Sequence, residues 1–222
     1  MRTHLAGVHL RTGAATWSNA TEVVTAASVI KLPVMVHVLR AVDAGTLAFD
    51  DVAPLVHPMI AVSSNDATNQ LLDVVGIAAV QRTVGSVGLA STHLRRRMMD
   101  LEARAAGREN VTTAADVVVL LRALVAGSLL SAPMTAFAMA CLHDQEFPAL
   151  PVPPGHRFAH KTGELAGVRH DAGILLDGAD APTAVVVALL SELDLDDDDE
   201  TPADLFHDAA EALSAGLTPR RA

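Results

Sequence analysis

The chain has 222 residues, about half of them hydrophobic, which allows one large domain or two small ones with a substantial buried core. Its formal net charge is −10, which argues against a nucleic-acid partner because phosphate binding needs a basic surface. No apolar run reaches the roughly 18 residues of a membrane span, so no membrane association is expected. The start MRTHLAGVHLRTG lacks the layout of a signal peptide. The sequence as written therefore predicts a cytoplasmic location, and a true start further upstream would change this to a secreted or periplasmic one.

The numbers of tyrosine, cysteine and lysine residues limit the reaction mechanisms that the chain can use. The chain has no tyrosine, which excludes a mechanism that needs a phenolate base. It has one cysteine, Cys141, which cannot form an internal disulfide and is predicted to be a small core residue. Lysine occurs only at Lys31 and Lys161, whereas arginine supplies nearly all the positive charge. This scarcity is either a composition bias or a sign that lysine stands where a compact amine, able to lose its proton, is needed.

The first elements predicted along the chain are a hairpin and a helix. Residues 5–11 alternate in hydrophobicity as a strand does, Thr12-Gly13 is a turn signal, and residues 14–24 can return as the second strand. A helix is expected from Ser28, apolar on nearly every face until Gly45 ends it. A helix with this pattern is buried.

The rest of the chain divides into a helical part and a second group of strands. Residues 46–155 are predicted to be mostly helical, with turn chemistry around HPMIAVSSNDATN, residues 57–69. Three strands joined by short turns follow in RFAHKTGEL, VRHDAGILLDG and APTAVVVALLSEL. An amphipathic helix, residues 202–217, closes the chain. The pattern predicts an α+β fold in which a five-stranded antiparallel sheet, formed by residues 1–45 and 156–222, is flanked by helices. The helical region 46–155 is inserted, and all parts form one compact catalytic unit.

Ser28 and Lys31 are the first candidates for catalysis. Positions i and i+3 of a helix lie on one face, so the lysine amine can reach the serine hydroxyl. Burial among valines and leucines disfavours the ammonium form and lowers the lysine pKa, which favours a neutral amine that can take the serine proton. Because this spacing also arises by chance, the pair indicates a nucleophile with its base only if further motifs support it.

Two further motifs supply this support. Ser63-Ser64-Asn65 lies in a turn of the helical part, and Lys161-Thr162-Gly163 lies on the first strand of the C-terminal group. With Ser28-Val29-Ile30-Lys31, they resemble the S-x-x-K, S-D-N and K-T-G motifs of class A β-lactamases and penicillin-binding proteins. The resemblance runs from about residue 5 to the end, includes both lysines, and implies a β-lactamase/transpeptidase-like fold.

The resemblance implies a role for each motif residue. Ser28 would attack the carbonyl of a β-lactam ring and form an acyl-enzyme, with Lys31 as base. Ser63 would pass a proton to the leaving nitrogen, and Asn65 would hold the substrate amide or Lys31. Lys161 and Thr162 would bind the substrate carboxylate, helped by Arg169 or His170. The backbone N–H groups of Ser28 and Glu164 would stabilise the oxyanion, and Gly163 would keep the strand edge open to substrate.

The sequence departs from the family pattern in two places. The middle motif is S-S-N, so its usual aspartate is missing, and Ser64 or Asp66 can offer hydrogen bonds instead. Counting back without gaps from Thr112-Thr113 puts Met98 where class A enzymes carry the glutamate that activates the deacylating water. The nearest carboxylates, Asp100 and Glu102, could serve after a small shift or could be structural. Slow deacylation is therefore expected, with Glu102 preferred over Asp100.

Three functions remain open at the level of sequence. The first is a β-lactamase-like serine hydrolase acting on a small β-lactam or related acyl substrate. The second is a penicillin-binding-protein-like D-alanyl carboxypeptidase or an esterase, and the third is a catalytically silent binding protein with the same fold. The histidines 156, 160 and 170 with Asp171 invite a metal-site interpretation, but no known ligand spacing supports it. No metal or other cofactor is expected, and the sequence leaves the oligomeric state open.

Overall fold

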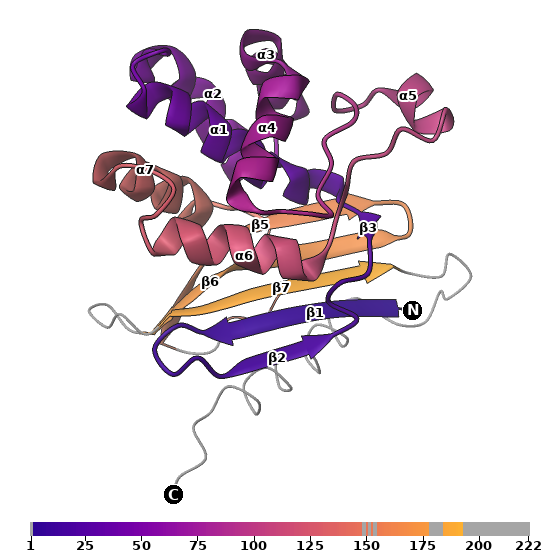
Figure 1. Ribbon diagram of the computed structural model, residues 1–222, viewed down its shortest axis with the longest axis vertical. Helices are drawn as coiled ribbons and strands as arrows, with labels where there is room; N and C mark the ends of the chain where they lie inside the picture. Colours follow the sequence, from indigo (N-terminus) through magenta and orange to yellow (C-terminus); the bar gives the residue numbers. More distant parts are fainter. Residues whose placement is uncertain (1, 148–149, 151, 153–154, 178–183, 193–222) are drawn as a thin grey trace, which may run out of the picture.

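The centre of the molecule is a five-stranded antiparallel sheet with strand order β2-β1-β7-β6-β5, covered by helices on one face (Figure 1). The structure is a computed structural model that describes residues 2–147, 150, 152, 155–177 and 184–192. The strands of the sheet are β1 Arg2–His9, β2 Ala15–Ser18, β5 His156–Leu165, β6 Val168–Asp177 and β7 Ala184–Glu192. The predicted mixed fold, with two N-terminal and three C-terminal strands in one antiparallel sheet, is confirmed.

Seven α-helices lie in the described part of the chain, all between the two groups of strands. Their bounds are α1 Lys31–Asp43, α2 Phe49–Ala61, α3 Asn65–Val75, α4 Ile77–Val87, α5 Leu101–Ala105, α6 Ala114–Val125 and α7 Ala132–His143. A short two-stranded sheet joins β3, Val24–Thr25, to β4, Val111–Thr112. This small sheet ties the start of the helical region to the loop that carries α5.

The buried helix expected from Ser28 begins with a tighter turn. A 3₁₀ turn, η1, spans Ala27–Ile30, and α1 then starts at Lys31. Pro33 lies in the first turn of α1, where its missing N–H leaves no intrahelical hydrogen bond unmade. The helix is buried over most of its length, as its apolar pattern predicts. The tight turn places Ser28 at the helix entrance rather than inside the helix.

Helix α2 runs further than the sequence indicated. A turn was expected around His57 and Pro58, yet the helix continues to Ala61. Pro54 and Pro58 stand one helical turn apart, so their missing N–H groups lie along one side of the helix and the hydrogen bonds elsewhere remain. As a result, α2 leads directly into the Ser63-Ser64-Asn65 turn.

Two predictions concern regions on which the structure gives no test. The closing helix predicted for residues 202–217 lies outside the described residues. The division into a sheet region, 1–45 with 156–222, and an inserted helical region, 46–155, stays a prediction.

In the described part of the chain, no helix is long and apolar enough to cross a membrane.

Candidate active site

Ser28 lies on η1 beside a residue with an unusual backbone. Ala27 has φ +43°, in the left-handed region that residues with a Cβ rarely adopt. Such a conformation persists only where the surrounding structure holds it, and it is commonest at functional sites. Ser28 itself is partly exposed, whereas Val29 and Ile30 after it are buried. The strained turn thus presents the serine at the edge of the core.

Lys31 follows one turn later, and its whole side chain is buried. Its Nζ donates to Ser63 O at 2.6 Å, to Ser63 Oγ at 3.1 Å and to Asn65 Oδ1 at 2.9 Å. Burial lowers the pKa of Lys31 to about 8. In the described structure Nζ makes no hydrogen bond to the Ser28 hydroxyl. The amine that the sequence paired with Ser28 is therefore held by the Ser63-Ser64-Asn65 turn.

The second lysine reaches the same hydroxyl from the sheet. Lys161 is also fully buried, and its Nζ donates to Ser63 Oγ at 3.0 Å and to Thr162 O at 2.9 Å. Burial first, and then the nearby charge of Lys31, lower the pKa of Lys161 to about 7. Since both amines contact one hydroxyl, they titrate as a coupled pair. We call Lys31, Ser63 and Lys161 the lysine cluster; both lysines can give up a proton near neutral pH.

The turn that carries Ser63 is shaped by its own strain and by a helix cap. Ser63 has φ +56°, also in the left-handed region. Ser64 caps α3, because its Oγ accepts a hydrogen bond from the backbone N–H of Ala67 at 3.1 Å. The Ser64 carbonyl also accepts from Thr68 Oγ1 at 2.6 Å. Ser64 therefore supplies the support that was expected from it or from Asp66, and Asn65 is directed at Lys31.

Strand β5 approaches Ser28 closely at Gly163. A Cβ added to Gly163 would lie 3.1 Å from the backbone N of Ser28 and 3.1 Å from Cβ of Ala27. Both distances are tighter than ordinary van der Waals contact, so a larger residue would push β5 away from η1. Glycine is thus needed for close approach, which brings the Lys161-Thr162-Gly163 strand against the backbone of the candidate nucleophile.

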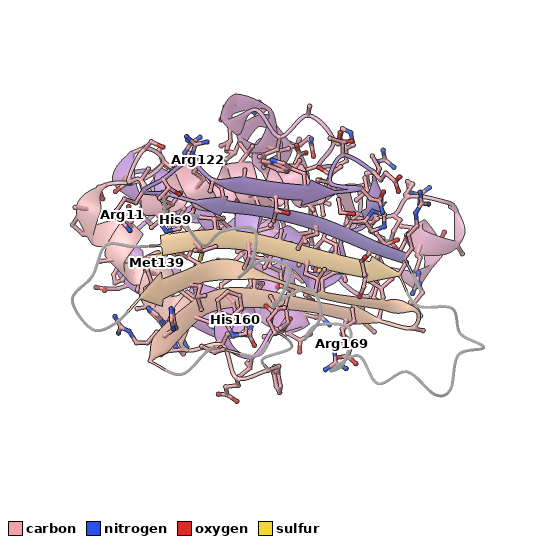
Figure 2. All side chains as sticks on the ribbon, turned by 90° about the horizontal axis from the view of Figure 1, so that it is seen from below. His9, Arg11, Arg122, Met139, His160 and Arg169 are labelled. Atoms are coloured by element: carbon pink, nitrogen blue, oxygen red, sulfur yellow. The ribbon has the colours of Figure 1, made fainter. Side chains whose placement is uncertain are left out.

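Arg169 and Glu164 lie next to this strand edge. They are cross-strand partners between β5 and β6, as are Thr162 and Asp171. Side chains alternate along a strand, so Glu164, Thr162 and Arg169 share one face of the sheet and Lys161 belongs to the other. Figure 2 shows the Arg169 side chain on the face opposite the helices. In the described structure Arg169 makes no hydrogen bond to the lysine cluster, so its predicted contact with a substrate carboxylate stays a prediction.

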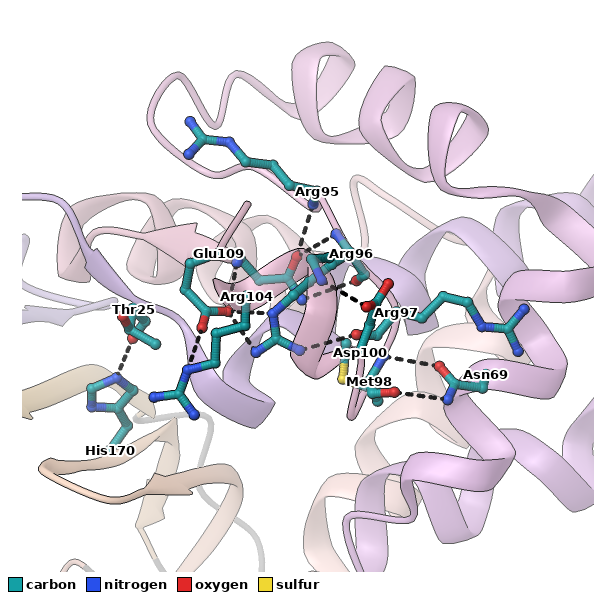
Figure 3. Close-up of polar contacts among 12 residues, drawn as sticks. Thr25, Asn69, Arg95, Arg96, Arg97, Met98, Asp100, Arg104, Glu109 and His170 are labelled. Atoms are coloured by element: carbon teal, nitrogen blue, oxygen red, sulfur yellow. Dashed lines mark hydrogen bonds and ion pairs between the residues drawn. The ribbon is translucent and has the colours of Figure 1, made fainter. Parts of the chain in front are cut away.

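The loop before β4 is fixed by many polar contacts, which Figure 3 shows. Asn69 holds both backbone groups of Met98: Met98 N–H donates to Asn69 Oδ1 at 2.9 Å, and Asn69 Nδ2 donates to Met98 O at 3.0 Å. Arg96 forms an ion pair with Glu109, with Nη2 to Oε1 at 2.6 Å, and Arg104 contacts the other oxygen of Glu109 at 3.3 Å. The side chain of Met98 packs into the main core. The position where a glutamate was expected is thus rigidly placed and apolar.

The two carboxylates nearest Met98 have different surroundings. Asp100 caps the short helix α5, since its Oδ1 accepts from Ala103 N–H at 2.8 Å. Glu102 lies in the first turn of α5 and is exposed. No hydrogen bond or ion pair joins either one to Ser28 or to the lysine cluster in the described residues. Their predicted part in activating water is therefore not supported by a direct contact.

Asn69 and His170 are residues whose part in the site the sequence did not reveal. Asn69 stands one helical turn after Asn65 on α3, and this i, i+4 spacing is a signal that could have pointed to it. His170 was considered for carboxylate binding, but its imidazole is fully buried and contacts the backbone of Thr25 and Ser191. The sequence carries no signal for these two backbone partners, because the register of β6 with β7 places Ser191 and the packing of the β3 segment on the large sheet places Thr25.

The metal-site interpretation of the C-terminal histidines receives no support from the geometry. Among the described residues, no group of three or more His, Cys, Asp and Glu side chains could hold a metal ion. His160 Nδ1 and Asp171 Oδ1 are 2.7 Å apart, and Asp171 Oδ2 accepts from Leu150 N–H at 2.9 Å. This buried pair joins neighbouring strands, on the face of the sheet seen in Figure 2.

Solved structures with the same fold include β-lactamases and a protein named PBP-A. A β-lactamase from Sphaerobacter thermophilus is 29% identical, with 98% of this chain and 92% of that one covered and a TM-score of 0.82. A β-lactamase from Desulfarculus baarsii is 22% identical over 98% of this chain and 93% of that one, with a TM-score of 0.85. A mutant of PBP-A, described as an acyl-enzyme complex with penicillin G, is 23% identical over 96% and 89%, with a TM-score of 0.84.

Sequence comparison identifies the family. No curated protein matches the chain. A model of a family described as the Beta-lactamase enzyme family matches residues 3–55 and 51–216, which together span nearly the whole chain. The match includes Ser28, the lysine cluster and the Lys161-Thr162-Gly163 strand. The chain therefore belongs to the Beta-lactamase enzyme family.

Proposed function

We propose that the protein is a serine hydrolase that opens β-lactam rings through an acyl-serine intermediate at Ser28. The observation that carries the proposal is the lysine cluster: two buried amines converge on Ser63 Oγ at 3.1 and 3.0 Å, next to the strained turn that presents Ser28. Burying two amines is costly when, among the described residues, no carboxylate is hydrogen-bonded to either Nζ, and a proton-transfer role explains why both are kept. Membership of the Beta-lactamase enzyme family supports the same chemistry.

The acylation step uses the cluster to move one proton. A neutral Lys31 has two N–H groups, which match the acceptors Ser63 O and Asn65 Oδ1, and its lone pair is left for a hydroxyl proton. Ser28 Oγ bonds to the carbonyl carbon as its proton passes to Lys31, and the amide C–N bond then breaks. Ser63 donates its proton to the leaving nitrogen and is reprotonated by a lysine. The Ser28 and Glu164 N–H groups stabilise the oxyanion.

Substrate binding follows from the strand beside the serine. A charged Lys161, with Thr162, binds the carboxylate of the β-lactam, and Gly163 lets the substrate lie along the edge of β5. Asn65 binds the substrate amide when it releases Lys31. Support comes from the close approach of β5 to Ser28, since a Cβ added to Gly163 would lie 3.1 Å from Ser28 N. The substrate class is thus a small carboxylate-bearing acyl compound.

Removal of the acyl group requires a residue that activates water, and the described part of the chain has no clear candidate for it. Met98 is apolar and packs into the core, so no carboxylate stands at the place where the family's water activator was expected. Glu102 is the candidate that remains on the loop, because Asp100 is used as a helix cap. This favours a second function, a D-alanyl carboxypeptidase or esterase like the penicillin-binding proteins, in which a β-lactam acyl group stays on the serine. A mutant of PBP-A is described as an acyl-enzyme complex with penicillin G.

Intact-mass measurement over time with a fluorescent penicillin tests the proposal. A transient adduct at Ser28 supports β-lactam hydrolysis, and a lasting adduct supports the second function. Ser28→Ala is expected to abolish the adduct with no change in melting temperature, because the side chain is partly exposed. Ser18→Ala, an exposed serine on β2, is the matched control and should label as the parent does. Labelling of Ser28→Ala, or no adduct in the parent, would overturn the assignment of the nucleophile.

A further inference from the structure

One imidazole in the sheet is bonded at both of its ring nitrogens. His170 lies on β6 and is fully buried. Its Nε2 is 2.7 Å from the carbonyl oxygen of Thr25, and a carbonyl can only accept, so Nε2 carries the proton. The backbone N–H of Ser191 donates to Nδ1 at 3.1 Å, so Nδ1 carries none. The two contacts together require the neutral Nε2–H tautomer.

This imidazole lies under the segment that leads to the serine. Thr25 ends β3 and lies three residues before Ser28. Figure 3 shows the contact of His170 with Thr25. The cross-strand partner of His170 is Gly163, the glycine that lies against Ser28 N. The cross-strand pair His170 and Gly163 therefore contacts this segment twice. The imidazole of His170 is hydrogen-bonded to Thr25, and the backbone of Gly163 lies close to Ser28.

The same segment is held from the opposite side by the loop and β4. Ala26 N–H donates to Asn110 O at 2.8 Å, and Thr25 pairs with Val111. The strained residue Ala27 follows directly, at φ +43°. Strain of this kind persists only where neighbouring contacts determine the backbone on both sides. The hydrogen bond from His170 is the contribution of the sheet to that support.

We propose that His170 is a positioning residue for acylation: its neutral imidazole fixes the Thr25 carbonyl and thereby holds the Ser28 hydroxyl and N–H in their reactive arrangement. The inference rests on the proposed function of Ser28 as the nucleophile. It assigns His170 no contact with the substrate, which differs from the carboxylate-binding role considered from the sequence. A misplacement of the nucleophile by a fraction of an ångström is enough to slow such a reaction strongly.

The charge state of His170 is set by its surroundings. Burial lowers its pKa, while the hydrogen bond to Thr25 and the charge of Glu192 on β7 oppose the shift more weakly. His4 on β1 also faces it and lies between Glu192, 3.4 Å away, and Glu22, 3.5 Å away. His170 is thus neutral at neutral pH. Protonation at acid pH would point Nδ1–H at the Ser191 N–H, and the loss of that bond would loosen the imidazole.

Two substitutions separate the two hydrogen bonds of the ring. In His170→Gln the amide nitrogen can reach Thr25 O, whereas in His170→Asn the shorter amide can accept from Ser191 N–H but cannot reach Thr25. The acylation rate constant and the dissociation constant before acylation are measured with a fluorescent penicillin. His170→Asn should acylate about 10 to 100 times more slowly with a dissociation constant changed less than about threefold, and His170→Gln should stay within about threefold in both. A merely structural role would not produce this split.

The pH profile adds a second signature. As pH falls through the lowered pKa of His170, the parent should take up a proton at His170 in addition to those at the lysine cluster, so its acylation rate falls more steeply there than that of His170→Gln. The variant retains only the titration of the lysine cluster. Equal slopes in the parent and in His170→Gln would contradict the proposal.

Controls distinguish failure of this inference from failure of the proposed function. His9→Asn replaces another buried histidine, on β1, whose Nδ1 accepts from Arg11 N–H at 3.2 Å, and it should acylate as the parent does. Nitrogen-15 NMR of the imidazoles should find the neutral Nε2–H tautomer at His170, whatever the activity. Another tautomer, normal acylation by His170→Asn, or an equal loss in His9→Asn would overturn the positioning role alone. A parent that does not acylate would overturn the function and this role with it.

Discussion

The two regions that flank Ser28 use polar side chains in opposite ways. In the lysine cluster, two amines converge on the side chain of Ser63, and both are buried with no hydrogen bond to a carboxylate of the described residues. In the loop around Met98, the side chains of Asn69, Arg96 and Glu109 form hydrogen bonds with backbone groups, and Arg96 also bonds to Glu109. The first arrangement costs stability and leaves protons free to move, whereas the second fixes a chain path.

This difference implies that the two halves of the proposed reaction are unequally equipped. The lysine cluster can accept and return a proton, which acylation needs. The loop presents a buried methionine and a capping aspartate, neither of which can activate water freely. In the proposed reaction, the site is thus arranged for the first chemical step, while the loop carries methionine at the position where a carboxylate was expected for the second.

The largest expected effect within the lysine cluster comes from Lys31→Arg. Guanidinium stays charged, so it cannot act as a base, and acylation should fall by about 10²- to 10⁴-fold. In the parent, acylation by a neutral ester should rise with pH through the pKa of Lys31, about 8, because the neutral amine is the active form. Stopped-flow acylation kinetics between pH 6 and about 9 give both results. A variant within tenfold of the parent, or a flat profile, would argue against Lys31 as base.

Met98→Glu tests the loop directly. The Asn69 contacts hold the backbone of residue 98, so a glutamate there should be presented at the place expected for the water activator. The acyl-enzyme lifetime should shorten by about 100-fold, a typical gain from a positioned general base. Met98→Gln is the matched control, with the same shape and no basic carboxylate, and should leave the lifetime nearly unchanged. If both variants behave alike, or if the parent adduct already clears within the mixing time, slow deacylation does not arise from this position.

Lys161→Ala should separate substrate classes. Capture of a carboxylate-bearing β-lactam should weaken by about 10- to 100-fold through loss of the charge-assisted contact, whereas a neutral ester should lose much less. Because the charged amine is the form that binds, carboxylate capture in the parent should also decrease as pH rises through the pKa of Lys161, about 7. Second-order acylation rates for the two substrates provide the comparison. Equal losses for both would assign Lys161 to the proton transfer through Ser63 instead.

The smallest effects are expected at the two loop carboxylates. Glu102→Gln should lengthen the adduct lifetime by no more than about threefold, since the side chain is exposed and could act only occasionally. Asp100→Ala should leave the lifetime unchanged but cost about 1 kcal/mol of unfolding free energy, because it removes the cap of α5. Single-turnover hydrolysis of a chromogenic cephalosporin and thermal melts measure the two effects. A tenfold longer lifetime in Glu102→Gln would make Glu102 the activator.

Much of the fold could be predicted from the sequence because its signals are local. Alternation over residues 5–11 and in the C-terminal strands indicates strands, and the apolar run after Ser28 indicates a buried helix. The turn predicted around residues 57–69 begins only at Val62, later than the histidine and proline at its start suggested, although a proline usually ends a helix. Here two prolines one turn apart share a side of α2, and packing against neighbouring helices keeps the helix intact.

The sequence by itself singled out the candidate side chains for the proposed chemistry, through three short motifs and the use of lysine at only two positions. Only the tertiary structure decided which residues these side chains form hydrogen bonds with. Lys161 lies 98 residues from Ser63 yet donates to its hydroxyl, and Lys31 turns to the same residue rather than to Ser28. His170 likewise supports Thr25, 145 residues away. The physical reason is that helix and strand periodicity fixes only near neighbours, whereas sheet register and helix packing bring distant backbone and side chains within hydrogen-bond distance.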